Sequence, residues 1–400
     1  MKFTNIVLTA ALALAAAAQA QAATKKEPAL TPAARANAIA FKFYSAQAGQ
    51  PGNLFFSPYS LHTAFAMAYE GAKGATAKEM AAVFSFPAAP ALRAGIGALE
   101  KDVKEAARGA DFAQANSFWA QEGYRFLPAY EGLLTTKYKA EARAANFKTA
   151  AEVSRRAINA WTEERTKGKI KDLFKEGALT PLTRLVLVNA VYFKGAWLRR
   201  FTKEMTGEAD FTRSDGEKVK AQMMTFSGQV SLPYGETDAF QVLRLPYGGG
   251  SLAMLLALPK DGQTLRDAEK TLGPALLEEL RAALGEQKVK VFLPRFTFSS
   301  GFDLNTVLPA LGMPLAFTDA ADFSGMDGTR NLYIQRAVHK AFVEVNEEGT
   351  EAAAATGVAM GLKSISFSPV FRADRPFLFF IEDKKTGLIL FMGRVEDPAK

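Results

Sequence analysis

The chain has 400 residues, of which 48% are hydrophobic, with a formal net charge of +8, two histidines and no cysteine. This length and apolar content allow one large core, and the missing cysteine excludes disulfides, a cysteine nucleophile and a lipid-modified cysteine. The cations are scattered among acids and are not interleaved with aromatic residues, so a solvated basic surface is favoured over a nucleic-acid site.

Residues 1–22 have the pattern of a secretory signal peptide. Lys2 precedes an apolar stretch from Ile6 to Ala18, and small residues suited to cleavage follow at Ala20 and Ala22. The apolar stretch is too short for a membrane helix. We therefore expect a mature chain of residues 23–400 in the periplasm or outside the cell, with no attachment to a membrane.

Helices are predicted in the first half of the chain. Apolar residues recur at helical spacing from Leu61 to Tyr69, and Thr76–Glu79 has the form of a capping box before a second helix. Both helices should be buried on one face. Val153, Ala157 and Trp161 indicate a further helix that ends near Gly168.

Strands are predicted mainly in the second half. Leu185–Phe193 is nearly all apolar, as expected for a central strand covered on both faces, and Leu332–Val345 is also strand-like. Phe377–Ile381 and Leu388–Phe391 indicate a hairpin. The glycines at 248–250 lie between strand-like segments and predict a turn, not a phosphate loop.

The segment after Val345 combines two incompatible patterns. Taken in steps of two, Thr350, Ala352, Ala354 and Thr356 fall on one face, and no side chain on either face is bulky before Met360. Such a segment can lie exposed as a loop, yet it could also enter a sheet as a central strand. An Ala-rich helix or linker is the plainer alternative.

At this segment the chain resembles the serpins. The match to their reactive-loop hinge runs from Glu347 to Thr356, and further matches occur along nearly the whole mature chain. These are Phe56–Ser60, Asn189–Trp197, Val338–Ala341, Arg375–Phe379 and Ile389–Val395. The resemblance implies an α+β fold: a single domain of 23–400 with a large mixed sheet, two smaller sheets, about eight to nine helices and an exposed C-terminal reactive loop at about 349–369.

The resemblance also implies three groups of site residues. The hinge comprises Glu347, Glu348, Gly349, Thr350, Glu351, Ala352, Ala353, Ala354, Ala355 and Thr356. The shutter, a polar cluster beneath the point where the middle strands part, comprises Ser57, Ser60, Asn189 and His339. The breach, where insertion begins, comprises Trp197, Arg295 and Glu347.

The role of His339 can also be predicted from the sequence without the resemblance. It shares a strand face with Ala337 and Ala341, and a lone histidine on such a face is usually a hydrogen-bonded core residue. The chain carries no recognisable nucleophile, nucleotide or zinc motif, so an enzyme is not expected, nor a metal or cofactor.

The implied function is suicide inhibition of a serine protease, held in a covalent complex by a monomeric inhibitor. Counting sixteen residues on from Glu347 reaches Lys363, so Lys363–Ser364 is the expected reactive bond and a trypsin-like enzyme the expected target. A one-residue slip to Leu362 would favour a chymotrypsin-like or subtilisin-like target. The alternatives are a non-inhibitory serpin that carries a ligand or acts as a chaperone and, less favoured, a plain binding protein or hydrolase. Sparse basic residues between Pro87 and Ala110 do not favour a heparin-type site.

Overall fold

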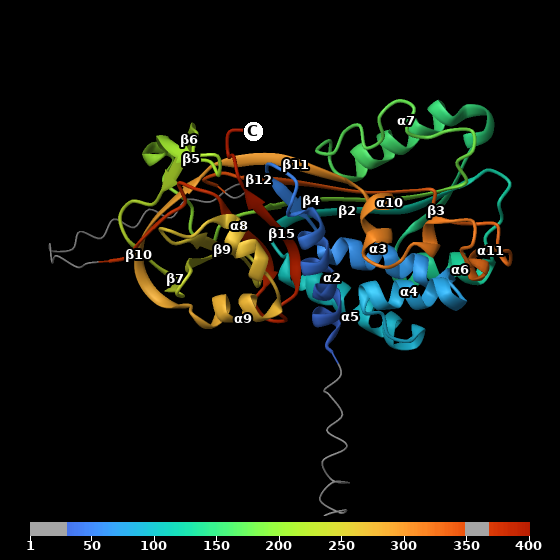
Figure 1. Cartoon of the computed structure of the whole chain (residues 1–400), viewed down its shortest axis with the longest axis horizontal. Coiled ribbons are helices and arrows are strands. Elements are labelled where there is room, and N and C mark those ends of the chain that lie inside the picture. Colours follow the sequence, from blue (N-terminus) through green and yellow to red (C-terminus); the bar gives the residue numbers. More distant parts are fainter. Residues whose placement is uncertain (1–29, 349–367) are drawn as a thin grey trace, which may run out of the picture. The chain divides into compact units, whose positions relative to one another are not determined.

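A computed structural model of the chain describes residues 30–348 and 368–400. Contacts between Cα atoms separate Met1–Thr31 from a compact unit of Pro32–Lys400, and every element named below belongs to that second unit. Its longer helices come before residue 166 and most of its strands after it (Figure 1). The predicted α+β class is confirmed.

The helices flank and cover the sheets. They are α2 (Pro32–Gln47), α3 (Pro58–Gly71), α4 (Gly74–Phe84), α5 (Ala89–Ala106), α6 (Pro128–Leu133), α7 (Phe147–Arg165), α8 (Leu265–Thr271), α9 (Pro274–Ala282), α10 (Leu304–Ala310) and α11 (Ser324–Asp327). A π-helical turn, η1 (Leu134–Tyr138), continues α6. The helix predicted around Leu61–Tyr69 is confirmed as α3, although it is buried almost all round and not on one face alone.

One sheet is mixed, with five strands in the spatial order β11, β12, β4, β2, β3. They are β2 (Ala110–Gln121), β3 (Glu141–Ala145), β4 (Leu185–Gly195), β11 (Phe296–Asp303) and β12 (Arg336–Val345). β12 pairs antiparallel with β11 but parallel with β4. β2 pairs antiparallel with β4 and parallel with β3. The prediction of Leu185–Phe193 as a central strand is confirmed, since every one of its residues is buried.

The other strands form two sheets that share the long strand β10 (Gly285–Pro294). The first half of β10 pairs with β7, the last strand of a sheet whose spatial order is β1, β15, β14, β9, β8, β7. The second half of β10 pairs with β6 and β13. The bounds are β1 (Leu54–Phe56), β5 (Gly207–Thr212), β6 (Lys218–Thr225), β7 (Val230–Glu236), β8 (Phe240–Pro246), β9 (Leu252–Pro259), β13 (Val370–Arg372), β14 (Phe377–Asp383) and β15 (Ile389–Val395). The predicted hairpin is confirmed as β14 and β15, and the glycines at 248–250 connect β8 to β9.

Helices cover both faces of the mixed sheet. Figure 1 shows α7 on one side of it and α2 and α3 on the other. Ile158 and Trp161 of α7 pack in one apolar cluster with Val186 and Val188 of β4. Residues of opposite parity on β4, such as Leu187, join the main core with α3. This double cover explains why β4 is apolar without alternation.

The helix predicted from Val153, Ala157 and Trp161 is confirmed as α7, which ends at Arg165, but these three residues do not share one buried face. Trp161 is buried, but Val153 is 57% exposed and Ala157 is also exposed. The buried stripe is instead Phe147, Ser154, Ile158, Trp161 and Thr162. Ala150, with φ −143°, interrupts the helix and resets its phase, and Thr162 Oγ1 donates to Ile158 O, which satisfies a buried hydroxyl within the helix.

The predicted capping box is also wrong. α4 begins at Gly74, so Thr76 and Glu79 lie inside the helix instead of at its first residues. Thr76 Oγ1 accepts a hydrogen bond of 2.9 Å from Asp322 N, and Glu79 Oε2 accepts one of 2.9 Å from Leu315 N. The two side-chain oxygens thus accept hydrogen bonds from backbone N–H groups distant in the sequence, and not from the first turn of α4.

Residues 74–106 would be long and apolar enough to cross a membrane if they formed one helix. Ser85, at φ 57°, and Pro87 divide them into α4 and α5 instead. The apolar stripe of α5 is buried in the core; its members are Leu92, Ile96, Leu99, Val103 and Ala106. These residues therefore serve as core helices.

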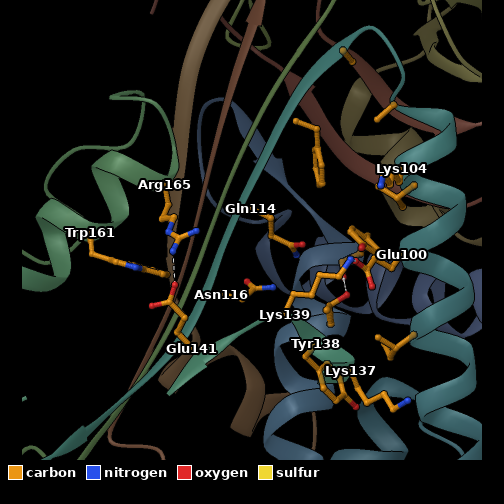
Figure 2. A pocket seen from close by; sticks show the side chains of 17 residues that line it. Glu100, Lys104, Gln114, Asn116, Lys137, Tyr138, Lys139, Glu141, Trp161 and Arg165 are labelled. Atoms are coloured by element: carbon orange, nitrogen blue, oxygen red, sulfur yellow. Dashed lines mark hydrogen bonds and ion pairs between the residues drawn. The ribbon is translucent and has the colours of Figure 1, made fainter. Parts of the chain in front are cut away.

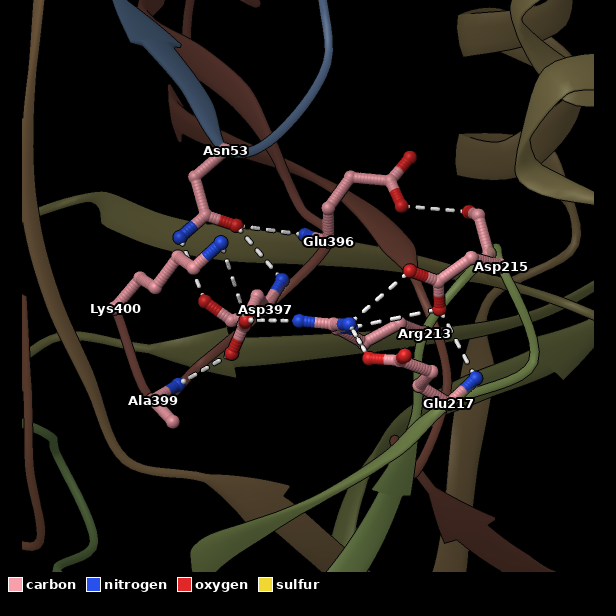
Figure 3. Close-up of polar contacts among 9 residues, drawn as sticks. Asn53, Arg213, Asp215, Glu217, Glu396, Asp397, Ala399 and Lys400 are labelled. Atoms are coloured by element: carbon pink, nitrogen blue, oxygen red, sulfur yellow. Dashed lines mark hydrogen bonds and ion pairs between the residues drawn. The ribbon is translucent and has the colours of Figure 1, made fainter.

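The chain end after β15 is held by a polar cluster (Figure 3). Asn53 Oδ1 accepts from Glu396 N at 2.7 Å and from Asp397 N at 2.9 Å. Arg213 Nη1 lies 3.2 Å from Asp397 Oδ2, so the residue after β5 and the residue before β1 both hold the C-terminus. β15, which precedes this cluster, is buried along its whole length.

Candidate functional site

The central feature of the mixed sheet is the seam between β4 and β12. Eight residue pairs join the two strands in parallel register, from Arg336↔Val186 to Val343↔Phe193. β12 alternates strictly between half-buried and buried residues, with His339 on the buried face beside Ala337 and Ala341, as predicted. The last residues before the segment 349–367 follow directly from β12.

The four shutter residues lie together beneath this seam and are all fully buried. Asn189 Nδ2 donates to Ser60 Oγ at 2.6 Å, and Asn189 Oδ1 lies 2.5 Å from His339 Nδ1. Ser57 N donates to His339 Nε2 at 3.1 Å, and Ser57 caps α3 by accepting from Ser60 N at 3.0 Å. The Asn189–His339 contact crosses the seam, so it must break or move if another strand enters there.

These contacts determine which ring nitrogen of His339 carries the proton, and burial keeps the ring neutral. Because Nε2 accepts a hydrogen bond from Ser57 N, the proton of the neutral ring sits on Nδ1 and is donated to Asn189 Oδ1. Burial lowers the pKa of His339 to about 3. The imidazole is therefore neutral near pH 7 and acts as a structural link between β12, β4 and the start of α3.

Lowering the pH from 7 to 5 should destabilise the folded protein through its two buried histidines. Burial lowers the pKa of both His62 and His339 to about 3, below the value of about 6.5 for an unfolded chain. Between these values the unfolded state binds more protons, so stability that is complete above pH 6.5 is lost as the pH falls. Each histidine should contribute a loss of about 2 kcal/mol at pH 5, at about 1.4 kcal/mol per pKa unit.

Denaturant midpoints at pH 7 and pH 5 measure this loss. His339→Gln and His62→Gln should each reduce the pH-dependent part by about half, whatever they do to stability at pH 7. If the double variant shows the same difference between pH 7 and pH 5 as the parent, carboxylates and not these histidines cause it.

The polar network extends further than the sequence predicted. Asn189 Nδ2 also donates to Asn116 Oδ1 at 2.5 Å, and Gln114 Nε2 donates to Ser60 Oγ at 2.8 Å. Gln114 and Asn116 are both on β2, two residues apart on the face that carries Phe118 further along. Two amides on an otherwise apolar strand face were a signal of this role.

The three breach residues meet where β12 ends. Trp197 Nε1 donates to Asn346 O at 2.8 Å, and its ring stacks on Tyr247 with 4.5 Å between centroids. Phe201 N donates to Glu347 O at 3.1 Å, and the guanidinium of Arg295 forms an ion pair with the Glu347 carboxylate. These contacts hold the residues immediately before the segment 349–367.

The Arg295–Glu347 pair is only partly buried. The side chain of Glu347 is 5% exposed and that of Arg295 is 41% exposed. Burial alone would raise the pKa of Glu347, but hydrogen bonds to the carboxylate, with Arg295 among the donors, hold it below its usual value. The pair is suited to positioning the end of β12, and it should add little to global stability.

The segment that follows is attached at both ends to different sheets. Of the hinge, Glu347 and Glu348 are described, whereas Gly349 to Thr356 and the predicted reactive bond Lys363–Ser364 lie outside the described residues. Beyond the segment, Lys290 N donates to Pro369 O at 3.0 Å, and β13 pairs parallel with β10. One anchor is therefore on β12 in the mixed sheet and the other on β13 beside β10.

α7 and the residues after it bridge the seam on the outer face. α7 packs on Val186 and Val188 of β4. Beyond its end, Lys340 Nζ donates to Lys171 O at 2.9 Å and Arg336 Nε donates to Ala178 O at 3.1 Å, both from β12. Separation of β4 from β12 would thus require this covering layer to shift.

Within residues 30–348 and 368–400, no group of three or more His, Asp or Glu side chains is placed to hold a metal ion. The expectation that the chain needs no metal or cofactor stays a prediction.

Comparisons with known proteins agree on one family. Residues 34–398 match the family model described as Serpin (serine protease inhibitor). The chain is 43% identical over 352 residues to Serpin B6 of Macaca fascicularis, covering 86% of this chain and 93% of that protein. It is 38% identical over 353 residues to the leukocyte elastase inhibitor of Bos taurus, covering 87% and 93%. Uncleaved ovalbumin has a similar structure, with a TM-score of 0.84 at 31% identity, covering 92% of this chain and 100% of ovalbumin.

Proposed function

The chain belongs to the serpin family, and from this premise we propose that it inhibits serine proteases by trapping them as acyl-enzymes through insertion of its reactive loop. The family description names serine protease inhibition, and one relative is named as an elastase inhibitor. The protein then acts as an inhibitor and not as an enzyme.

The observation that carries this proposal is the parallel pairing of β12 with β4. A segment that leaves the end of β12 and turns back into the seam would run antiparallel to β12. Because β4 is parallel to β12, the same segment would be antiparallel to β4 as well. One inserted strand could therefore form regular antiparallel hydrogen bonds on both sides, replacing a parallel pairing that is slightly weaker per residue.

The hinge sequence fits such an entry. The residues from Gly349 to Thr356 are small apart from Glu351, so they would meet little steric resistance between two existing strands. The breach contacts of Glu347 and the shutter contact between Asn189 and His339 would hold β4 and β12 together. They would have to break one after the other as the strand enters. We assign these residues positioning roles in insertion and no catalytic role.

The chemistry belongs to the protease. Its serine attacks the carbonyl carbon of the scissile residue, the peptide bond breaks, and the new amino terminus takes a proton and leaves. The inhibitor remains attached through an ester. Before cleavage, the anchor at β13 limits how far the segment can enter the seam, and cleavage removes that restraint. Serpin loop insertion is an established example of release of stored strain.

Incubation with trypsin should give a complex that survives denaturing electrophoresis and a released peptide that begins at Ser364. A lysine at position 363 matches a primary pocket that carries an acid, as in trypsin-like enzymes. Electrophoresis and mass spectrometry measure both products, and trypsin with its serine blocked is the control. A stable complex with a peptide beginning at Lys363 would move the reactive bond to Leu362, and cleavage without any complex would favour a carrier or chaperone.

We further propose export of the protein as a monomer, with residues 1–22 removed and 23–400 forming the mature inhibitor. Residues 1–22 lie outside the described residues, and the family match begins only at residue 34. The pattern of Lys2, the apolar stretch and Ala20 or Ala22 supports removal. The absence of cysteine from the whole chain makes its folding independent of the redox state outside the cell.

A further inference from the structure

Three segments distant in the sequence meet where β2 begins and β4 ends, and each contributes glycine to the contact. The register of the sheet places Ala110, the first residue of β2, opposite the last residue of β4. We call this contact the glycine junction. Its members are Gly109 from the turn after α5, Gly195 at the end of β4, and Gly248, Gly249 and Gly250 from the turn between β8 and β9. The glycines at 248–250, which the sequence predicts only as a turn, therefore take part in a tertiary contact.

The turn between β8 and β9 lies directly on the backbone that follows α5. A methyl group at Gly250 would lie 2.0 Å from Ala106 O, and one at Gly249 would lie 2.3 Å from Arg108 O. Gly249 also has a φ of +84°, a conformation that residues with a side chain disfavour. Backbone thus meets backbone here, with no flexible side chain between the two turns to absorb a displacement.

The position of the turn from α5 to β2 depends on this contact more than on packing between α5 and β2. Below the turn, a pocket of about 430 Å³ lies between the two elements. Figure 2 shows Lys104 of α5 at one side of this pocket, and Gln114 and Asn116 of β2 toward the other side. Because the pocket interrupts side-chain packing between α5 and β2, the glycine junction is the rigid contact at this end of the sheet.

The glycine junction is connected to the breach through two aromatic residues. Gly248 N donates to Ala196 O at 2.7 Å. The next residue, Trp197, forms an antiparallel bridge with Tyr247, and the two rings are stacked with 4.5 Å between centroids and 10° between planes. Trp197 Nε1 in turn donates to Asn346 O at 2.8 Å, just after the end of β12. The turn at 248–250 and the end of β12 are thus linked through Tyr247 and Trp197.

Gly195 brings the end of β4 into the same link. A methyl group at this position would lie 2.6 Å from Tyr247 Cδ1 and 2.6 Å from Phe193 Cζ. The missing side chain therefore lets the buried Tyr247 ring approach the backbone of β4. As a result, a shift of the turn at 248–250 cannot leave the Tyr247 ring unchanged.

We propose that the glycine junction positions Tyr247 and Trp197 so that the breach stays closed, and that it thereby sets how fast a strand can enter the seam. The inference rests on the proposed insertion mechanism. Because Tyr247 directly precedes the three glycines, a displacement of their turn moves its ring and the stacked Trp197 ring with it. That movement weakens the hydrogen bond from Trp197 Nε1 to Asn346 O, which holds the end of β12. The glycines are positioning residues that act through these two aromatic side chains.

Uptake of a peptide by the intact protein tests the proposal. A fluorescent peptide with the sequence of residues 350–362 should enter the seam of the parent slowly, as followed by anisotropy and native electrophoresis. Gly250→Ala should take up this peptide at least about fivefold faster, the change in rate expected when the equivalent of one hydrogen bond is lost before the barrier. Gly207→Ala is the matched control, because its methyl group meets no described atom within 4 Å, and it should behave like the parent.

Gly109→Ala tests the glycine junction from its other side and does not depend on whether Gly250→Ala folds. Its methyl group would lie 3.3 Å from Gly248 O, a milder conflict, and its φ is +76°. Gly123→Ala has the same kind of backbone strain, with φ +92°, but its methyl group meets no described atom within 4 Å. Gly109→Ala should therefore take up the peptide at least about twofold faster than Gly123→Ala.

A double-variant cycle with Trp197→Phe separates positioning of the breach from a general loss of stability. Trp197→Phe removes the donor to Asn346 O and should speed peptide uptake by itself. In combination with Gly250→Ala it should add little, because both changes act through the same hydrogen bond. Equal uptake by Gly250→Ala and Gly207→Ala, or rate effects that add fully with Trp197→Phe, would overturn the inference while leaving insertion intact. A parent that takes up no peptide would instead overturn the proposed insertion, and this inference with it.

Discussion

Cleavage within residues 349–367 of the folded protein should raise its melting temperature by about 20 °C or more. The seam offers hydrogen-bond partners on both β4 and β12, and the sequence from Thr350 onward can enter it once the tether to β13 is cut. A new central strand of about ten residues gains about ten net hydrogen bonds at about 1 kcal/mol each. In a large domain, each kcal/mol raises the melting temperature by about 2 °C. The uncleaved form is then kinetically held and not the most stable packing.

A metalloprotease that cuts between Gly349 and Phe367 is the suitable reagent, because it forms no acyl-enzyme that could remain attached. Scanning calorimetry compares the nicked protein with a sample treated with the same protease plus chelator. Unchanged melting of a cleanly nicked chain would contradict insertion and favour the carrier or chaperone alternative.

Local features of the fold were predictable because they depend on nearest-neighbour patterns. The unbroken apolar run of β4 identifies a strand covered on both faces, and the charged turn between Ile381 and Leu388 identifies the hairpin of β14 and β15. Periodicity alone could not pair Arg295 with Glu347, because their ion pair joins residues 52 positions apart. That expectation came from the resemblance to a family.

The errors in the prediction arose where tertiary contacts override local propensity. Thr76 and Glu79 have the form of a cap, yet they accept from the backbone of Asp322 and Leu315, which pack beside α4 only in the folded chain. Val153, Ala157 and Trp161 lie at helical spacing on α7, yet only Trp161 is buried, because the face packed on the sheet is that of Ser154, Ile158 and Trp161. Neither effect has a signature within one turn of helix.

The extension of the shutter network onto β2 has a consequence for mutations at the seam. Asn189 donates to both Ser60 and Asn116, so its removal would take a donor away from α3 and β2 and would leave the Nδ1–H donor of His339 on β12 without its acceptor. Effects of substitutions at these positions should therefore not add, since they share one network.

Thr350→Arg should convert the protein from an inhibitor into a substrate of its target protease. Position 350 lies outside the described residues, but by alternation Thr350 is the first residue on the inward face of the entering strand. An arginine there would carry an unpaired charge into the core of the sheet. If this raises the insertion barrier by about 3 kcal/mol, insertion slows about a hundredfold, and deacylation wins. Electrophoresis with trypsin should then show cleavage at the usual bond with little covalent complex.

Glu351→Arg is the matched control, because it places the same side chain one residue later on the opposite face, where the sequence already carries a charge. Both variants lie well before Lys363, so acylation rates should stay close to those of the parent. The control should trap trypsin as the parent does, since its arginine can remain in solvent. Equal loss of trapping in both variants would indicate a general effect of charge on the hinge, and full trapping by Thr350→Arg would show that early burial of position 350 does not limit the reaction. Only a loss confined to Thr350→Arg matches a strand that enters the seam with alternate residues facing inward.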